Sequence, residues 1–141
     1  MTTANTTAEN TAAANKDLVQ RALGELIGTG DVDAFGAYLR DDFVHHRPDA
    51  TSSTKAEWLA AVRAALGPLA GMEVEIEHVV AEGDRVVMSS RRRLPGGGGP
   101  EVAIVDILRV EDGLLAEAWE IIEPVAGAAA NLRWWEPGGR R

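Results

Sequence analysis

Residues 101–122 read EVAIVDILRVEDGLLAEAWEII, two apolar runs that flank Asp112-Gly113. An Asp-Gly pair favours the tight turn of a β-hairpin, because both residues adopt a positive φ more readily than most others. Apolar runs of this length, rich in Val and Ile, are typical of strands. The stretch therefore predicts a hairpin made of strands 101–110 and 114–122.

Further strands and helices are predicted upstream of this hairpin. Residues 72–80 alternate apolar with acidic side chains, and residues 85–94 follow after a turn. A period of two predicts a strand in each segment. The apolar period is helical in residues 16–28, and again after residues 54–57, which form a capping-box sequence. Helices followed by antiparallel strands place the chain in the α+β class.

The chain has 141 residues, a length that suits one domain. Residues 1–15 are mostly Thr, Ala and Asn and are expected to be a disordered leader. Residues 16–135 are expected to form the domain, and residues 136–141 a flexible tail. The leader lacks the basic start and the apolar centre of a secretory signal, so a cytoplasmic location is expected.

Composition argues against several classes of protein. The formal net charge is -8, whereas a nucleic-acid binder needs a basic surface to displace counterions from phosphates. No apolar stretch approaches the ~20 residues that span a bilayer, so no membrane partner is expected. The chain has no Cys, and the adjacent His45 and His46 point to opposite faces of an extended segment, so neither a metal nor a cofactor is expected. The glycines at 96–99 lack the Lys-Ser/Thr of a phosphate-binding loop and are interpreted as a linker or a lid.

Asp106 is the one charged residue in the run 102–108, within the most apolar of the predicted strands. Burial among apolar residues disfavours the ionised carboxylate and raises its pKa, which makes Asp106 a candidate proton donor or acceptor. The alternative is a structural carboxylate paired with a buried donor. Counting back from the hairpin turn places Asp106 opposite Trp119.

Three consecutive arginines, residues 91–93, lie in the strand before the hairpin. Pairing that strand with residues 72–80 gives a solvent-exposed ladder of opposite charges, in which Arg91 lies near Glu75 and Arg93 near Glu73. Arg92 then points to the other face, where it is expected to pair with Asp106 or to hold a substrate oxygen. The pattern leaves the register open by one residue, so it does not decide whether Arg91 or Arg92 faces the interior.

Both faces of the predicted hairpin are largely apolar, and both should therefore be covered. The predicted helices can cover only one of them. The uncovered face is expected to carry Val105, Ile107, Ala118 and Ile122. This arrangement predicts a homodimer that packs sheet to sheet.

Three segments carry a resemblance to a known family. Residues 39–48, LRDDFVHHRP, resemble an aromatic–aliphatic–Gln–His–x–Pro segment. Residues 105–113, VDILRVEDG, resemble a strand and turn with the sequence VDIFRVEDG. Residues 119–125, WEIIEPV, resemble the usual end of the domain. In this order the segments are similar to those of the SnoaL-like polyketide cyclases, within the nuclear-transport-factor-like superfamily. The resemblance spans residues 16–135. It implies a cone-shaped curved sheet wrapped around a long helix, an internal apolar cavity and usually a homodimer.

In the cyclases that this chain resembles, an aspartate matching Asp106 acts as acid or base in an intramolecular aldol closure without a cofactor. His46 falls where related folds place a second polar catalytic group. Ketosteroid isomerases share the fold and have an oxyanion-hole aspartate that matches Asp106. Their catalytic tyrosine is matched by Ala22 and their base aspartate by His46, so their mechanism is not expected here.

The resemblance therefore implies an enzyme of secondary metabolism that closes a ring in an apolar, polyketide-type intermediate. Asp106 and His46 are the predicted catalytic residues, and the predicted substrate contacts are Tyr38, Trp58, Met88, Arg92 and Trp119. An isomerase or an epoxide-hydrolase-like enzyme of the same fold is the nearest alternative. A non-catalytic module that binds a small molecule is the other, since this fold hosts many functions.

Overall fold

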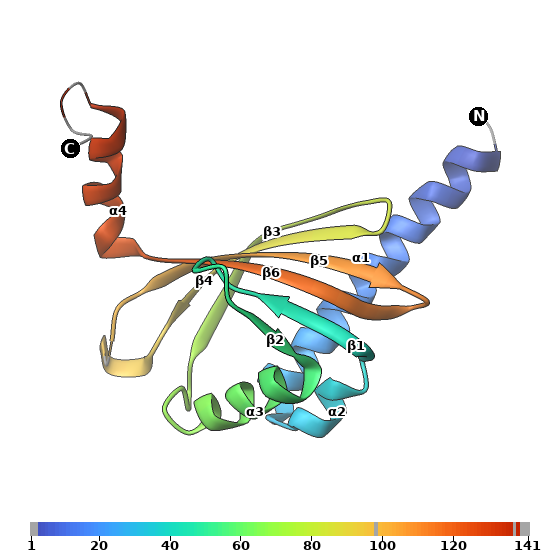
Figure 1. The fold of residues 1–141 in the computed structure, drawn as a ribbon, viewed down its shortest axis with the longest axis horizontal. Helices are drawn as coiled ribbons and strands as arrows, with labels where there is room; N and C mark the ends of the chain where they lie inside the picture. Colours follow the sequence, from blue (N-terminus) through green and yellow to red (C-terminus); the bar gives the residue numbers. More distant parts are fainter. Residues whose placement is uncertain (1–2, 98, 137, 139–141) are drawn as a thin grey trace.

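The computed structural model describes residues 3–97, 99–136 and 138, and within them one curved sheet with helices on its concave side (Figure 1). The helices are α1 (Thr3–Thr29), α2 (Val32–Gly36), α3 (Lys55–Leu66) and α4 (Val125–Asn131), and the short 3-10 turns are η1 (Pro95–Gly97) and η2 (Leu132–Trp135). The strands are β1 (Leu39–His46), β2 (Ser52–Thr54), β3 (Glu73–Glu82), β4 (Arg85–Arg93), β5 (Val102–Glu111) and β6 (Leu114–Pro124). The predicted α+β class is confirmed.

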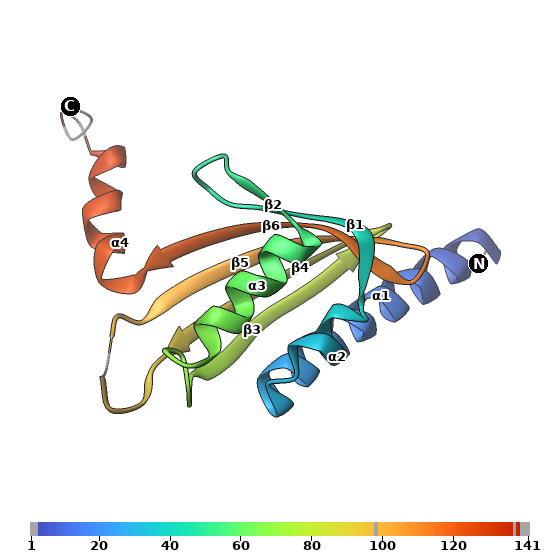
Figure 2. The same ribbon diagram turned by 60° about the horizontal axis from the view of Figure 1, so that its bottom comes forward.

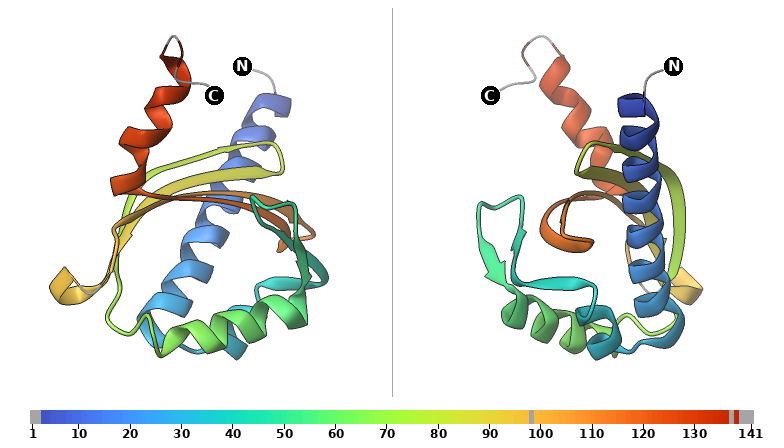
Figure 3. Two further views of the ribbon diagram at one scale, coloured as in Figure 1. Left: turned by 60° about the vertical axis from the view of Figure 1, so that its left-hand side comes forward. Right: turned by 90° about the vertical axis from the view of Figure 1, so that its right-hand side faces the viewer.

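The strands lie in the order β2-β1-β6-β5-β4-β3, so the sheet has two edges and does not close into a barrel. All neighbours pair antiparallel except β1 and β6, which run parallel. Helices α1, α2 and α3 lie on the concave side, whereas α4 projects from the end of β6 (Figures 2 and 3). The core lies between α1 and the sheet, with Phe43 and Val86 among its most deeply buried side chains. The expected cone with an apolar interior is therefore present.

The register of β3 and β4 agrees with the predicted charge ladder. Glu73 pairs with Arg93 and Glu75 with Arg91, on the convex face. Arg92 pairs with Val74 on the concave face, so Arg92 rather than Arg91 points into the cone.

The hairpin between β5 and β6 turns at Asp112-Gly113, whose φ values of 53° and 74° are those that the Asp-Gly pair was expected to supply. The register then shifts between Arg109 and Val110, which leaves an extra residue on β6. Such a bulge moves every later side chain of that strand to the opposite face.

Because of this bulge, the predicted pairing of Asp106 with Trp119 is wrong: Asp106 pairs with Glu120. The assignment of the faces changes with it. Ala118 and Ile122 join Asp106 on the concave face, and Trp119 moves to the convex face.

The structure also differs from the expected leader. Helix α1 begins at Thr3, so residues 3–15, expected to be disordered, continue the helix toward its N-terminus. Asn15 is 8% exposed, and its Nδ2 donates to the carbonyl oxygen of Gly83 over 3.1 Å, which places it in the packed part of the domain. Near the other end, and still within the expected domain, residues Val125–Asn131 form α4. Residues 1, 2, 137 and 139–141 lie outside the described residues.

We expect deletion of residues 1–10 to leave the melting temperature unchanged, because Met1 is the only large apolar residue in that segment. Asn15→Ala in the full chain is the matched comparison. It removes one partly buried hydrogen bond, about 1 kcal/mol, and should lower the melting temperature by about 4 °C in thermal denaturation followed by circular dichroism. A drop of that size in the deletion variant would show that residues 1–10 also stabilise the domain.

Candidate active site

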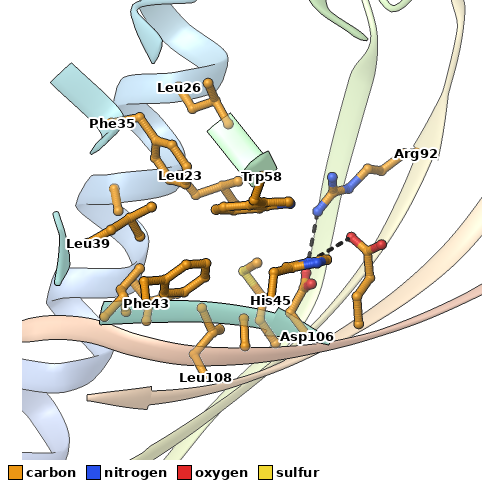
Figure 4. Close-up of a pocket in the computed structure, with 16 residues that line it drawn as sticks. Leu23, Leu26, Phe35, Leu39, Phe43, His45, Trp58, Arg92, Asp106 and Leu108 are labelled. Carbon is orange, nitrogen blue, oxygen red and sulfur yellow. Dashed lines mark hydrogen bonds and ion pairs between the residues drawn. The ribbon is translucent and has the colours of Figure 1, made fainter. Parts of the chain in front are cut away.

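A pocket opens between α1, α3 and the concave face of the sheet (Figure 4). Most of its wall is apolar and comes from all parts of the cone: Val19, Ala22, Leu23, Leu26, Phe35, Leu39, Phe43, Trp58, Met88, Leu108, Leu115 and Ala118. Four polar side chains complete the lining: His45, Arg92, Asp106 and Glu120. In Figure 4, His45, Arg92 and Asp106 lie toward one end, opposite Phe35 and Leu39.

Four adjacent strands supply the polar end, one residue each. His45 comes from β1, Glu120 from β6, Asp106 from β5 and Arg92 from β4, all on the concave face. Their side chains are between 2% and 19% exposed. Arg92 Nη2 lies 3.5 Å from Asp106 Oδ2, and Arg92 Nε donates to the buried Ser90 Oγ over 3.3 Å. Ser90 thus helps to orient the guanidinium toward Asp106.

Asp106 has the buried carboxyl that its sequence context predicts. Burial raises its pKa from 3.8 to about 6; the positive charge of Arg92 opposes this shift and the negative charge of Glu120 adds to it. A carboxyl with a pKa near 6 holds its proton for part of the time near neutral pH and releases it readily. Asp106 can therefore serve as either a proton donor or a proton acceptor in this pocket.

Glu120 and His45 are pocket residues that the sequence analysis missed. Burial also raises the pKa of Glu120. Burial lowers the pKa of His45 to about 4, with smaller contributions from Arg47 and His46, so the imidazole is neutral at physiological pH. The His45 ring stacks on Trp58 with a centroid distance of 4.6 Å and an interplanar angle of 11°. The alternation of Phe43 inward and Val44 outward is the signal in the sequence that could have identified His45.

His46, predicted to be catalytic, lies on the convex face, because side chains alternate along a strand. Its Nε2 lies 2.5 Å from Glu117 Oε2 and its Nδ1 lies 2.9 Å from Ser52 Oγ. Its ring stacks on Trp119, with a centroid distance of 5.3 Å. The structure therefore groups His46 with Trp119 outside the pocket, and neither lines it.

The other predicted substrate contacts divide between pocket and core. Trp58 and Met88 line the pocket. Tyr38 packs against the core, but it is not part of the pocket wall. Within the described residues, no group of three His, Cys, Asp or Glu side chains is arranged to hold a metal ion. No helix of that part of the chain combines the length and apolar character needed to cross a membrane.

A family model for the SnoaL-like domain matches residues 19–118, from α1 into β6. The chain belongs to the SnoaL-like domain family. The matched region holds the apolar pocket wall together with His45, Arg92 and Asp106, whereas Glu120 lies two residues beyond its end. The expected family is therefore confirmed. A search of curated proteins gave no match.

Solved structures share the SnoaL-like fold at low sequence identity. IdmH from Streptomyces antibioticus, described as a putative polyketide cyclase, is 21% identical, with a TM-score of 0.66 over 77% of this chain and 91% of its own. AclR from Streptomyces galilaeus, described as a putative hydroxylase, is 20% identical, with a TM-score of 0.70 over 81% of both chains. A protein from Kribbella flavida described as a putative ketosteroid isomerase is 19% identical, with a TM-score of 0.67 over 81% of both chains. At these identities the likeness establishes the fold.

Proposed function

We propose that this SnoaL-like protein is a cofactor-independent enzyme that closes a ring in an apolar, polyketide-type carbonyl compound by acid–base chemistry. The observation that supports the proposal is the carboxyl of Asp106, which has a pKa of about 6 and lies at the polar end of an otherwise apolar pocket. A polyketide-type intermediate combines hydrocarbon segments with carbonyl groups. The apolar wall of the pocket can contact the hydrocarbon part of such a compound, and Arg92 and Asp106 can contact its carbonyl groups.

In the proposed reaction, the carboxylate of Asp106 removes a proton from a carbon next to a carbonyl group. The electron pair of that C–H bond forms an enolate, which Arg92 stabilises by its positive charge. The enolate carbon then attacks a second carbonyl carbon of the same molecule, and the resulting alkoxide takes a proton from Asp106. The pocket contributes further by holding a flexible chain in its reactive shape, since orientation alone can supply much of the acceleration.

A non-catalytic module that binds a small molecule is the second candidate. The 3.5 Å contact between Arg92 and Asp106 favours it, because a buried carboxylate paired with a guanidinium also occurs as a purely structural element. The two candidates differ in whether Asp106 exchanges its proton with a bound carbonyl compound.

Proton exchange with a neutral ketone tests the proposal without knowledge of the natural substrate. We would incubate the protein with α-tetralone, a bicyclic ketone, in D2O and follow the loss of the hydrogens next to the carbonyl by proton NMR. The proposed enzyme accelerates this exchange above buffer. A ketone that binds, as judged by NMR line broadening, without faster exchange would favour the binding module.

We also propose a homodimer formed through the convex face of the sheet. The bulge in β6 revises the expected surface, which now carries Val80, Val105, Ile107 and Ile121. Val80 is 59% exposed and Ile121 is 52% exposed, and the described helices α1, α2 and α3 lie on the other face.

Sedimentation equilibrium at micromolar concentration is expected to give twice the chain mass of 15.0 kDa, because burial of this apolar face favours association. Ile121→Lys should shift the protein toward monomer, since it places a charge in the proposed interface. Tyr38→Phe, a change within the domain, serves as the control. A wild-type protein that stays monomeric at these concentrations would contradict the proposal.

A further inference from the structure

The polar end of the pocket contains two carboxyls and one guanidinium. Asp106 and Glu120 are directly opposite each other on neighbouring strands, and both side chains lie on the concave face. Side chains in this relation have Cβ atoms about 5 Å apart. The two carboxyls are thus close enough to each other to contact one small molecule bound in the pocket.

The charges around this pair do not balance if both carboxyls are ionised. Arg92 is the nearest cation, and its charge acts on both Asp106 and Glu120. Arg47, on the exposed side, adds a weaker positive contribution at Glu120. Two carboxylates against one buried guanidinium would leave an excess negative charge in an apolar pocket. Keeping one proton on the pair, which is favoured below about pH 6, removes that charge, as happens for other carboxyls that share a site.

His45 lies beside Glu120 at the polar end. The His45 ring is almost fully buried beneath Trp58, and its Nε2 lies 3.9 Å from Glu120 Oε2 (Figure 4). Its Nδ1 is buried and finds no hydrogen-bond partner among the described residues. An unpaired acceptor is tolerated better than an unpaired N–H donor. The neutral ring is therefore expected to carry its proton on Nε2, the nitrogen that lies 3.9 Å from Glu120 Oε2.

We infer that Asp106 and Glu120 act as a pair that shares one proton, with Glu120 as the second catalytic carboxyl and His45 as the residue that positions it. The inference rests on the proposed function. In one complex, the ionised member removes a proton from the carbon next to the carbonyl, and the protonated member gives its proton to the carbonyl oxygen. The C–H bond breaks, its electron pair forms the C=C bond of a neutral enol, and an O–H bond forms. The two carboxyls exchange roles.

This arrangement also defines the class of substrate. With one shared proton, the pair and Arg92 together carry no net charge, so the polar end matches a neutral, enolisable ketone. A substrate with a free carboxylate or phosphate would return an excess negative charge to the pocket, and we expect it to be excluded.

Carboxyl titration measures the shared proton without any substrate. Asp and Glu would be labelled with carbon-13 at their carboxyl carbons, and the signals of Asp106 and Glu120 identified by their loss in Asp106→Asn and Glu120→Gln. Both substitutions keep the size and shape of the side chain. In Glu120→Gln, the titration midpoint of Asp106 should fall by about one pH unit, because a like charge is lost; Asp106→Asn should lower that of Glu120 similarly.

Glu117→Gln is the matched control, because Glu117 is on the same strand as Glu120 but on the convex face. It should leave the titration midpoints of Asp106 and Glu120 unchanged. The wild-type protein gives a second measurement that needs no variant. Coupled carboxyls produce a two-step curve at both carbons, whereas independent carboxyls produce one step each. The shared proton would be contradicted if each carboxyl titrated in a single step. It would also be contradicted if the titration midpoint of each carboxyl were unchanged when the other one is replaced.

The positioning role of His45 is tested by the same signals. His45→Phe keeps a ring under Trp58 but removes the N–H group, and it should move the titration midpoint of Glu120. His45→Gln restores an N–H donor near the position of Nε2 and should bring the midpoint back. If the titration midpoint of Glu120 is the same in the wild type and in both variants, His45 does not position Glu120.

Exchange of α-tetralone separates this inference from the proposed function. Glu120→Gln and Asp106→Asn should each reduce the rate by about 100-fold, and the double variant should be little worse, because the two groups act as a unit. If Asp106→Asn alone loses activity, Glu120 is not a partner, although the proposed function stands. If neither variant loses activity, the proposed function itself fails.

Discussion

Asp106→Asn is expected to lower the rate of α-tetralone exchange by about 100-fold or more, with little change in ketone binding. The amide keeps the shape and volume of the carboxyl but cannot take up or release a proton at neutral pH. Since the pocket wall is unchanged, binding should persist. The measurement is the exchange rate at saturating ketone, together with the ketone dissociation constant determined by NMR titration.

The same substitution has an expected effect on stability that depends on pH. The pKa of Asp106 is about 6 in the folded protein and 3.8 in the reference state, so the folded state binds the proton more tightly. Its contribution to stability is therefore fully present below pH 3.8 and is lost as the pH rises through 6, a change of up to about 3 kcal/mol. Asp106→Asn removes this pH dependence and should be at least as stable as the wild type at pH 7.

Denaturant unfolding at pH 4 and pH 7 measures this effect, with Asp84→Asn in the exposed β3–β4 turn as the control. The opposite result would be a loss of several kcal/mol at pH 7, as expected when one partner of a structural buried ion pair is removed. That outcome, with exchange activity retained, would support the binding module rather than the enzyme.

Phe43→Ala is expected to destabilise the domain by about 3–5 kcal/mol and to lower the melting temperature by more than about 10 °C. Phe43 is 1% exposed and lies in both the core and the pocket wall, next to Trp58 with a ring-centroid distance of 5.2 Å. Removing the ring leaves a cavity that the surrounding strands and helices cannot fill completely. Thermal denaturation followed by circular dichroism measures the change.

Ile27→Ala is the matched control, because it also removes a large apolar side chain, but one that is 42% exposed near the end of α1 and outside both the pocket and the proposed dimer face. Its effect within a monomer should stay below about 1 kcal/mol. Equal destabilisation in both variants would mean that Phe43 is not part of the packed core.

The residues that sequence reasoning placed correctly depend on local patterns. Asp106 stands out because it interrupts an apolar strand. Arg92 lies on the concave face, as the alternation of side chains along its strand suggested, although the pattern left Arg91 as an alternative and β3 shifts register between Ile76 and His78. The hairpin at Asp112-Gly113 is similarly local, since the turn requires residues that accept a positive φ. These features needed no knowledge of distant contacts.

The residues that were missed depend on irregularities of the backbone and on tertiary contacts. Glu120 faces the pocket only because of the bulge near Val110, and no residue type in that segment marks a bulge. The resemblance to the family points to His46, whereas the alternation of buried side chains along β1 points to His45. Strand β2 and helix α4 have three and seven residues, too few for a periodic pattern of apolar residues to identify them.

The parallel pairing of β1 with β6 has a consequence for how the chain folds during synthesis. Residues Leu39–His46 reach the ribosome exit long before Leu114–Pro124, the strand that hydrogen-bonds along them. At a synthesis rate of about 5–20 residues per second, β1 is made several seconds before β6, the strand with which it pairs. During that time the edge of β1 is unpaired, and the apolar residues that later form the pocket are open to water. Premature termination before residue 114 should therefore yield a product that aggregates or requires a chaperone, since β1 cannot pair with β6.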